Sequence, residues 1–297
     1  MGEWIVSVEG TETGKLAAML LALMAAVMHA ALGVLQKGKH DPWLSRGAID
    51  IWVGVMAIPL AIFVVPLPGP ELWVLFPGMM LIHLAYKWFM AMAYSRGAFT
   101  AVYPIVRGTG PLVTVLFAGV VFGEFFTWGQ WGGVAMLSGG IFALALWNVR
   151  NAEIDREILV AASGLAFLTG IMTAIYTVYD AYAIRAAEDP FTFIVWFFLL
   201  ELVLFPLLLW KRWMSAGPIL GSLFRRGLLG AVIAYLSFSG VFLATRLDKV
   251  GEAAALRETS VVFGALMGWI FLGERIGPVR SALMIVIAGG AVLVEFG

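Results

Sequence analysis

Ten apolar segments, each roughly 20 residues long, divide the chain, and this pattern constrains the fold more than any other feature of the sequence. The breaks between them hold residues that stop helices, such as Asp41-Pro42 and Asp189-Pro190. Inside a bilayer only helices and closed barrels satisfy the backbone, and long runs without alternation are typical of helices. The sequence therefore predicts an all-α membrane protein with ten transmembrane helices, at Lys15–Leu35, Trp43–Val65, Leu72–Tyr94, Ala98–Phe122, Trp128–Trp147, Ile158–Ile184, Phe191–Trp210, Gly227–Thr245, Val250–Leu272 and Pro278–Phe296.

The charge content agrees with this interpretation. Charged residues make up 13% of the 297 residues, against roughly 25% in a soluble domain. The formal net charge is zero, which gives no field that would attract nucleic acid. The chain has no cysteine, which excludes disulfides and thiolate chemistry. Glu3, Glu9 and Glu12 precede the first apolar run, whereas a secretory signal peptide starts with basic residues, so we expect that run to stay as a helix.

Lysine and arginine are distributed unequally between the two sets of loops. Twelve fall on the side that holds the loops after the first, third, fifth, seventh and ninth helices, and four fall on the other side. Loops rich in Lys and Arg stay in the cytoplasm. We therefore expect a multi-pass protein of a bacterial-type inner (plasma) membrane, with both termini outside.

The two halves of the chain repeat at an offset of 150 residues. An intramembrane arginine and a Gly-Glu pair both recur at this offset, which chance seldom produces. The coincident pairs include Arg96/Arg246, Arg107/Arg257, Thr109/Thr259, Leu116/Leu266, Gly123/Gly273, Glu124/Glu274, Gly139/Gly289 and Gly140/Gly290. Because five helices is an odd number, the second unit inserts upside down. The sequence predicts two inverted five-helix repeats, 1–149 and 150–297, an arrangement typical of secondary transporters.

Several of these strings resemble a known family. In the first unit they are Ala93-Tyr94, Tyr103-Pro104-Ile105-Val106-Arg107-Gly108 and Gly123-Glu124, and in the second Ala255-Leu256-Arg257-Glu258-Thr259-Ser260 and Phe271-Leu272-Gly273-Glu274-Arg275. The chain is similar over nearly its whole length to the drug/metabolite transporter superfamily, in its ten-helix EamA-type branch. The resemblance implies alternating-access transport of a small metabolite. Members carry amino acids, sugars, nucleotide derivatives, amines or phosphorylated metabolites, so the substrate does not follow.

Two intramembrane arginines are the strongest candidates for a substrate site. Arg107 lies about 13 Å into the fourth predicted helix and Arg257 about 10 Å into the ninth, so the repeat aims both at one central layer. A guanidinium fork matches carboxylate, phosphate or phosphonate, which favours an anion clamp. Alternatively, both arginines are neutralised by acids of the bundle. The candidate acids, which we also consider for proton coupling, are Glu258, Glu201 and Asp180.

Other polar and aromatic residues fall inside predicted helices. On the fourth helix Tyr103 and Thr114 share the face of Arg107, and on the sixth Thr169, Thr173, Tyr176 and Asp180 form one stripe. Such stripes line a cavity or bond to neighbouring helices. We expect Lys87 to snorkel toward the cytoplasm, and Gly123-Glu124 and Gly273-Glu274 to end helices with Glu at the surface. The further candidate cavity residues are His29, His83, Tyr235 and Trp196.

Three functions are consistent with these features. The first is a secondary transporter for a small anionic or zwitterionic metabolite, driven by a proton gradient or by exchange. The second is an exporter of amino acids, amines or other uncharged or cationic metabolites. The third is a lipid-headgroup flippase or an intramembrane enzyme, although the sequence holds no hydrolase, zinc-protease or phosphate-loop motif. We expect no catalytic residue, metal or cofactor, and as partners only a small-molecule substrate and the bilayer, in a monomer or homodimer.

Overall fold

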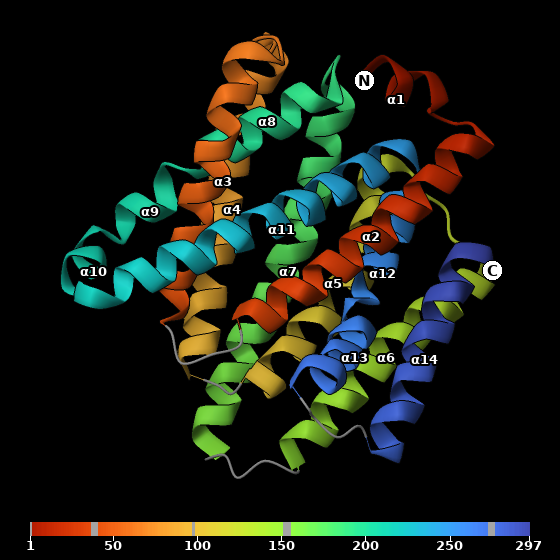
Figure 1. Ribbon diagram of the computed structural model, residues 1–297. Helices are drawn as coiled ribbons and strands as arrows, with labels where there is room; N and C mark the ends of the chain where they lie inside the picture. The colour runs from red at the N-terminus through yellow and green to blue at the C-terminus, as the bar shows by residue number, and fades with distance from the viewer. Residues whose placement is uncertain (1, 37–40, 97–98, 151–155, 273–276) are drawn as a thin grey trace.

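A computed structural model describes residues 2–36, 41–96, 99–150, 156–272 and 277–297. These residues form helices connected by short turns (Figure 1). The first seven elements are α1 Gly2–Val8, α2 Glu12–Gln36, α3 Pro42–Phe63, α4 Pro70–Arg96, α5 Phe99–Phe122, α6 Trp128–Arg150 and α7 Arg156–Ala186. The others are α8 Pro190–Glu201, α9 Leu204–Leu208, α10 Trp210–Ser215, η1 Gly217–Ile219, α11 Leu220–Leu247, α12 Val250–Glu258, α13 Ser260–Leu272 and α14 Pro278–Phe296.

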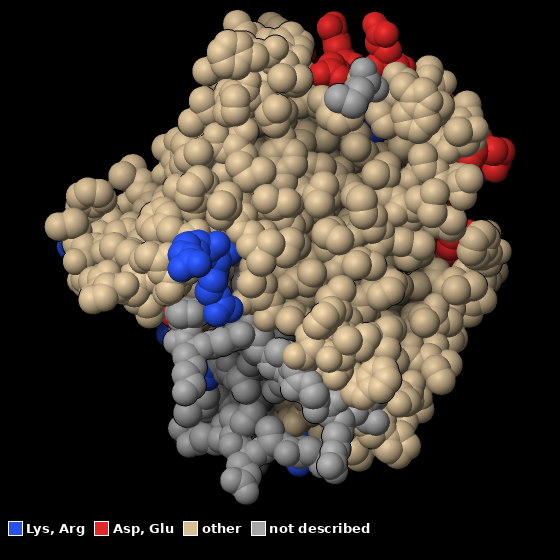
Figure 2. All heavy atoms as spheres, viewed as in Figure 1, with Lys and Arg blue, Asp and Glu red and all other residues tan. Residues whose placement is uncertain are grey.

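Ten stretches of the described residues are long and apolar enough to cross a membrane. The prediction of an all-helical membrane protein with ten spans is therefore confirmed. Figure 2 shows a broad face almost free of charged side chains, with acidic groups toward the end where α1 lies and basic groups on the opposite part. An uncharged band of this kind suits contact with lipid.

Capping residues explain where two of these helices begin. The Asp41 carboxylate accepts the backbone N–H of Trp43, and Pro42 occupies the first position of α3. Asp189 likewise accepts the N–H groups of Phe191 and Thr192 at the start of α8. A side-chain oxygen satisfies a backbone donor that has no partner within the helix, and the fixed φ of proline suits the first turn.

Two spans predicted as single helices are interrupted. The seventh breaks after Glu201, because Pro206 has no N–H to donate to the carbonyl of Leu202, four residues earlier. The ninth breaks at Thr259, where the backbone N–H and the hydroxyl both donate to the Leu256 carbonyl. A hydrogen bond over three residues is typical of a 3-10 turn, which is wound more tightly than the α-helix on either side. Two further differences are the short α1, which was not predicted, and α11, which begins seven residues earlier than predicted.

The helices of the two halves are intermixed rather than segregated. The first span, α2, packs on α11, and α4 packs on α7, while α6 and α14 lie side by side (Figure 1). At the offset of 150 residues, α2 corresponds to α7 and α11 corresponds to α4. The contact between α2 and α11 is therefore equivalent to the contact between α7 and α4. This pattern is consistent with two inverted repeats. In the middle of the bundle, α12 packs against both α5 and α2.

Candidate functional site

Both intramembrane arginines contact the same carboxylate. Arg107 on α5 lies 3.1 Å through Nη1 from Glu258 Oε1 and 3.2 Å from Oε2. Arg257, next to Glu258 at the end of α12, reaches Oε1 through Nη2 and Nε, at 3.2 Å in each case. All three side chains are buried, at 5% exposure or less. The two arginines, one from each half of the chain, therefore come together, and Glu258 is the acid between them.

One carboxylate serving two guanidinium groups leaves this triad with one positive charge more than negative. The offset of 150 residues places Gly108 opposite Glu258, so the first half has no equivalent acid. Arg257 additionally lies 3.5 Å from the Thr177 hydroxyl on α7. Buried charges of this kind are stabilised only when paired and hydrogen-bonded. Among the groups bonded within the triad, the excess positive charge favours the binding of a further anion; the Asp180 carboxylate also lies within electrostatic range of Arg257.

Aromatic rings flank the two guanidinium groups. The Arg107 Cζ atom lies 5.3 Å from the centroid of the Tyr103 ring, and the Arg257 Cζ atom lies 6.0 Å from that of Tyr176. At these distances the negative face of the ring attracts the cation. The Tyr103 hydroxyl is also 3.4 Å from the Ser260 hydroxyl, across the two halves. Tyr103 and Tyr176 therefore belong to the same site as the arginines.

His83 and Asp180 form a second buried pair beside the triad. His83 Nε2 on α4 lies 2.8 Å from Asp180 Oδ2 on α7. The His83 ring also packs against Tyr176, with centroids 4.7 Å apart, so the pair connects to the ring beside Arg257. The Asp180 side chain is 2% exposed, so it is buried and not solvated. The burial follows from α4 packing along α7.

The threonines of the predicted stripe are buried and bond within their own helix. The Thr173 hydroxyl donates to the Thr169 carbonyl at 2.9 Å. Thr114, on the Arg107 face of α5, has a buried hydroxyl without a hydrogen-bond partner in the structure. Gly110 lies between Arg107 and Thr114 on the same face of α5 and faces the site. A methyl group added there would lie 3.7 Å from Thr173 and 3.9 Å from Glu258. This glycine keeps side-chain bulk away from the carboxylate.

The remaining candidates are divided between the site and the aromatic core. His29 on α2 is partly buried and lies within electrostatic range of Arg107 and Arg257. Tyr235 instead stacks on Phe198, with centroids 4.2 Å apart, and the Trp196 ring packs 5.3 Å from that of Trp73. No group of three or more His, Asp or Glu within the described ranges is placed to hold a metal ion.

Sequence reasoning missed a second ion cluster at membrane depth. The Lys87 ammonium on α4 lies 2.8 Å from Asp50 on α3 and also contacts Glu201 at the end of α8. Asp50 in turn lies 3.0 Å from Arg46 Nε, one helical turn earlier. Lys87 is 1% exposed, so the expectation that it snorkels is wrong. The missed signal was an Arg and an Asp four residues apart inside an apolar run.

Glu124 also lies differently from the prediction. Gly123 ends α5 with a φ of +65°, as expected for a glycine after a helix. The Glu124 side chain, however, is only 7% exposed and accepts the N–H groups of Val250 and Gly251 at the start of α12. Burial raises the pKa of Glu124 above its ordinary value, although these two bonds and Arg185 oppose the shift. The counterpart Gly273-Glu274 lies outside the described residues.

Comparisons with known proteins agree with this architecture. The model of the EamA-like transporter family matches residues 161–296. No curated protein matches the chain. One solved crystal structure is similar over 94% of this chain and 97% of its own length, with a TM-score of 0.75 at 19% identity, which establishes a shared fold alone. The second half of the chain, residues 161–296, is thus similar to the EamA-like transporter family of the drug/metabolite transporter superfamily, and the ten membrane spans agree with a multi-pass membrane protein of this kind.

Proposed function

We propose that this transporter carries a small anionic or zwitterionic metabolite across the inner membrane by alternating access, and that Arg107 and Arg257 bind its acidic group. The observation that carries this proposal is the triad, in which two guanidinium groups from opposite halves share the carboxylate of Glu258. The shared Glu258 carboxylate supports the idea that both guanidinium groups are placed to donate to one acidic group, and a substrate would supply a second as carboxylate, phosphate or phosphonate.

The charge balance favours an anionic ligand. Counting only the bonded groups, the triad carries two positive charges and one negative charge. A bound monoanion would neutralise the surplus in a buried region, where an uncompensated charge is costly. Guanidinium groups also present several donors in a plane, so one arginine can bond to Glu258 and to a substrate at once.

Alternating access would follow from the origin of the two arginines. We infer that residues 1–149 and 150–297 act as two inverted units, each supplying one arginine to a site near the midplane. Movement of one unit against the other would then expose the site to either side in turn. Both termini would face outside, on the strength of the loop charges.

The test combines a binding screen with transport. Purified protein is screened by thermal shift against organic acids, amino acids, phosphonates and amines, and uptake of the best ligand is measured in liposomes. Arg107→Lys keeps the charge and loses the planar fork, so affinity should fall by roughly 1–3 kcal/mol, or about 5- to 150-fold. Arg280→Lys is the matched control, because Arg280 bonds to Asn148 in a different part of the bundle. Normal uptake of an anion by a folded Arg107→Ala protein would eliminate the clamp.

A second candidate is an exporter of amines or other uncharged or cationic metabolites. It is favoured by the aromatic cluster of His83, Tyr86 and Tyr176, whose rings lie 4.7 and 4.9 Å apart around Tyr176. In this case Glu258 would stay bound to both arginines permanently. Stabilisation by amines and not by any anion in the same screen would support this function and contradict the first.

A further inference from the structure

The cluster that contains Lys87 is separate from the triad of Arg107, Glu258 and Arg257. It draws its four charged groups from three elements: Arg46 and Asp50 from α3, Lys87 from α4 and Glu201 from α8. All four lie inside membrane spans, and their side chains are 9% exposed or less. Two cations and two carboxylates give the cluster a net charge of zero. Burying four charges inside membrane spans is costly, which marks them as candidates for a role beyond packing.

The two carboxylates of this cluster are not held equally. Asp50 has a cation on each oxygen, with Arg46 at 3.0 Å and Lys87 at 2.8 Å. Glu201 has Lys87 alone as an ion-pair partner among the residues that the structure describes. If Glu201 gains a proton, Lys87 keeps Asp50 as its counter-charge. Loss of the negative charge on Asp50 would instead affect two cations. Glu201 is therefore the carboxylate of the pair that can take up a proton at the lower electrostatic cost.

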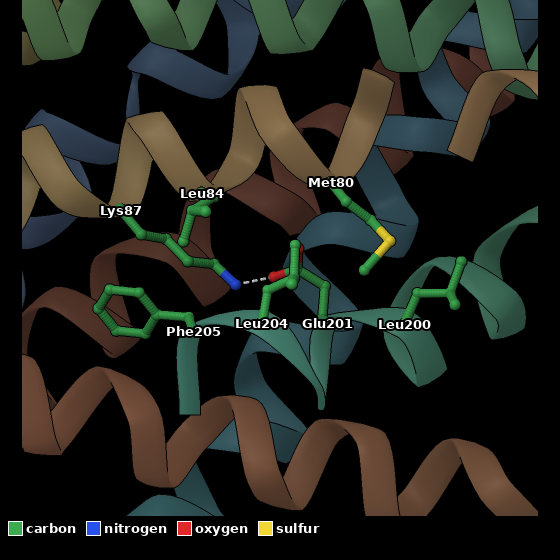
Figure 3. Close-up of a pocket in the computed structure, with 7 residues that line it drawn as sticks. All are labelled: Met80, Leu84, Lys87, Leu200, Glu201, Leu204 and Phe205. Carbon is green, nitrogen blue, oxygen red and sulfur yellow. Dashed lines mark hydrogen bonds and ion pairs between the residues drawn. The ribbon is translucent and has the colours of Figure 1, made fainter. Parts of the chain in front are cut away.

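The backbone is interrupted where Glu201 lies. Glu201 is the last residue of α8, and the helix resumes as α9 only at Leu204. A small cavity lies between this break and α4, and Lys87 and Glu201, which are in direct contact, form part of its wall (Figure 3). Its other lining residues are Met80, Leu84, Leu200, Leu204 and Phe205. The ion pair is thus exposed to an internal space at a point where the span has no continuous helix to keep it rigid.

We propose that Glu201 is a proton-binding site of the transporter, and that proton uptake there releases α9 from α4. The Glu201 carboxylate accepts a proton from a hydronium ion, leaving water, and its contact with Lys87 gives way. Lys87 stays protonated and keeps its contact with Asp50, so the cluster passes from zero to one positive charge. The span then loses its polar connection to α4 at its own break, where α9 and α10 can change direction.

Charged and titratable groups near Glu201 come from four helices that pack on α8, namely α3, α4, α7 and α11. Lys87 is the direct partner, and the other groups lie further along the neighbouring helices. From α4 there is also His83, from α3 Asp50 and Arg46, from α7 Asp180 and Tyr176, and from α11 Tyr235. His83 and Asp180 bond to each other, which leaves the Lys87 contact as the one that the proton would break.

The experiment needs no substrate, so its result is independent of the proposed anion site. Proton uptake by the purified full chain is counted in detergent between neutral pH and the most acidic pH at which it stays folded. Glu201→Gln mimics the protonated side chain and should take up one proton fewer per chain than wild type. Glu71→Gln removes an exposed carboxylate at the start of α4 and calibrates the signal of one titrating group. Equal uptake by wild type and Glu201→Gln overturns the proposal.

The second measurement follows the release of α9. Because the chain has no cysteine, a single Leu204→Cys substitution can be labelled with a water-soluble maleimide without background. Ser222→Cys, on an exposed part of α11, is the reference for the pH dependence of the thiol reaction itself. Relative to this reference, labelling at 204 should rise several-fold on acidification, and Glu201→Gln should make it high at every pH. If labelling at position 204 changes neither with pH nor with the Glu201→Gln substitution, the release of α9 is refuted.

Discussion

Replacing Glu258 with Gln should destabilise the protein more than replacing either arginine that it binds. The reason is the uneven count of charges in the triad. Arg107→Gln leaves Glu258 with Arg257 still at 3.2 Å, so one ion pair survives. Glu258→Gln leaves two buried guanidinium groups close together and removes the carboxylate that is bonded to both. An ordinary pair of one acid and one base would give similar costs for either substitution.

The size of the difference follows from the geometry. Nη1 of Arg107 and Nη2 of Arg257 lie 3.1 and 3.2 Å from the same oxygen, Glu258 Oε1, so the two nitrogens are no more than about 6 Å apart. At that separation and an effective dielectric constant of about 20, two unit charges repel by about 3 kcal/mol. Removing one partner of a buried pair costs on the order of 3–5 kcal/mol by itself. We expect Glu258→Gln to reach or exceed the top of that range and Arg107→Gln to stay near or below its lower end.

The assay is thermal unfolding in detergent, followed by intrinsic fluorescence, for wild type, Glu258→Gln, Arg107→Gln and the double variant. The double variant should be more stable than Glu258→Gln alone, because it removes the repulsion. Added phosphate should stabilise Glu258→Gln more than wild type, since the unpaired guanidinium groups accept an anion. An Arg107→Gln protein less stable than Glu258→Gln would refute the shared-carboxylate reasoning.

Three further predictions concern the scaffold. Gly54→Ala should lower the melting temperature, because the added methyl group would overlap Leu202 at the break between α8 and α9. The expected cost is about 1–3 kcal/mol. Gly132→Ala should have no such effect, because that position faces open space. The raised pKa of Glu124 favours the protonated folded state, so wild type should lose stability as pH rises through that pKa. Melting curves across pH should lack this loss in Glu124→Gln. A reporter active only in the cytoplasm should stay silent when fused after Gly297, and a strong signal would invert the topology.

The membrane spans could be predicted from sequence because the thickness of the bilayer sets how many consecutive residues must be apolar. A segment must stay apolar for roughly 20 residues, and its ends carry residues that cap or stop helices. Asp41-Pro42 and Asp189-Pro190 satisfy both conditions, and helices begin where they occur. The break after Glu201 was less visible, since Pro206 lies five residues beyond it and its effect falls on the carbonyl of Leu202.

The site was partly predictable for a different reason. Repetition at a fixed offset identified Arg107 and Arg257 as a pair, and the structure brings them to one carboxylate. Periodicity on a helix does not reveal which neighbour a residue faces, so the pairing of Lys87 with Asp50 and Glu201 could not be derived. Lys87 was interpreted by its depth in the membrane alone. Only the packing of α3, α4 and α8 removes its route to the surface.

The asymmetry of the triad has a consequence for the proposed transport cycle. Glu258 is adjacent to Arg257 in the chain, so these two move together, whereas Arg107 belongs to the other half. When the halves shift, Arg107 is the group that must part from Glu258, and Gly108 offers no replacement acid. A bare cation at a helix centre costs roughly 2.5–3.5 kcal/mol on insertion scales. A bound anion that stays with Arg107 removes this cost, so the loaded transporter passes through the shift more readily than the empty one. In the proposed cycle, the surplus positive charge would thereby couple movement of the halves to the presence of substrate.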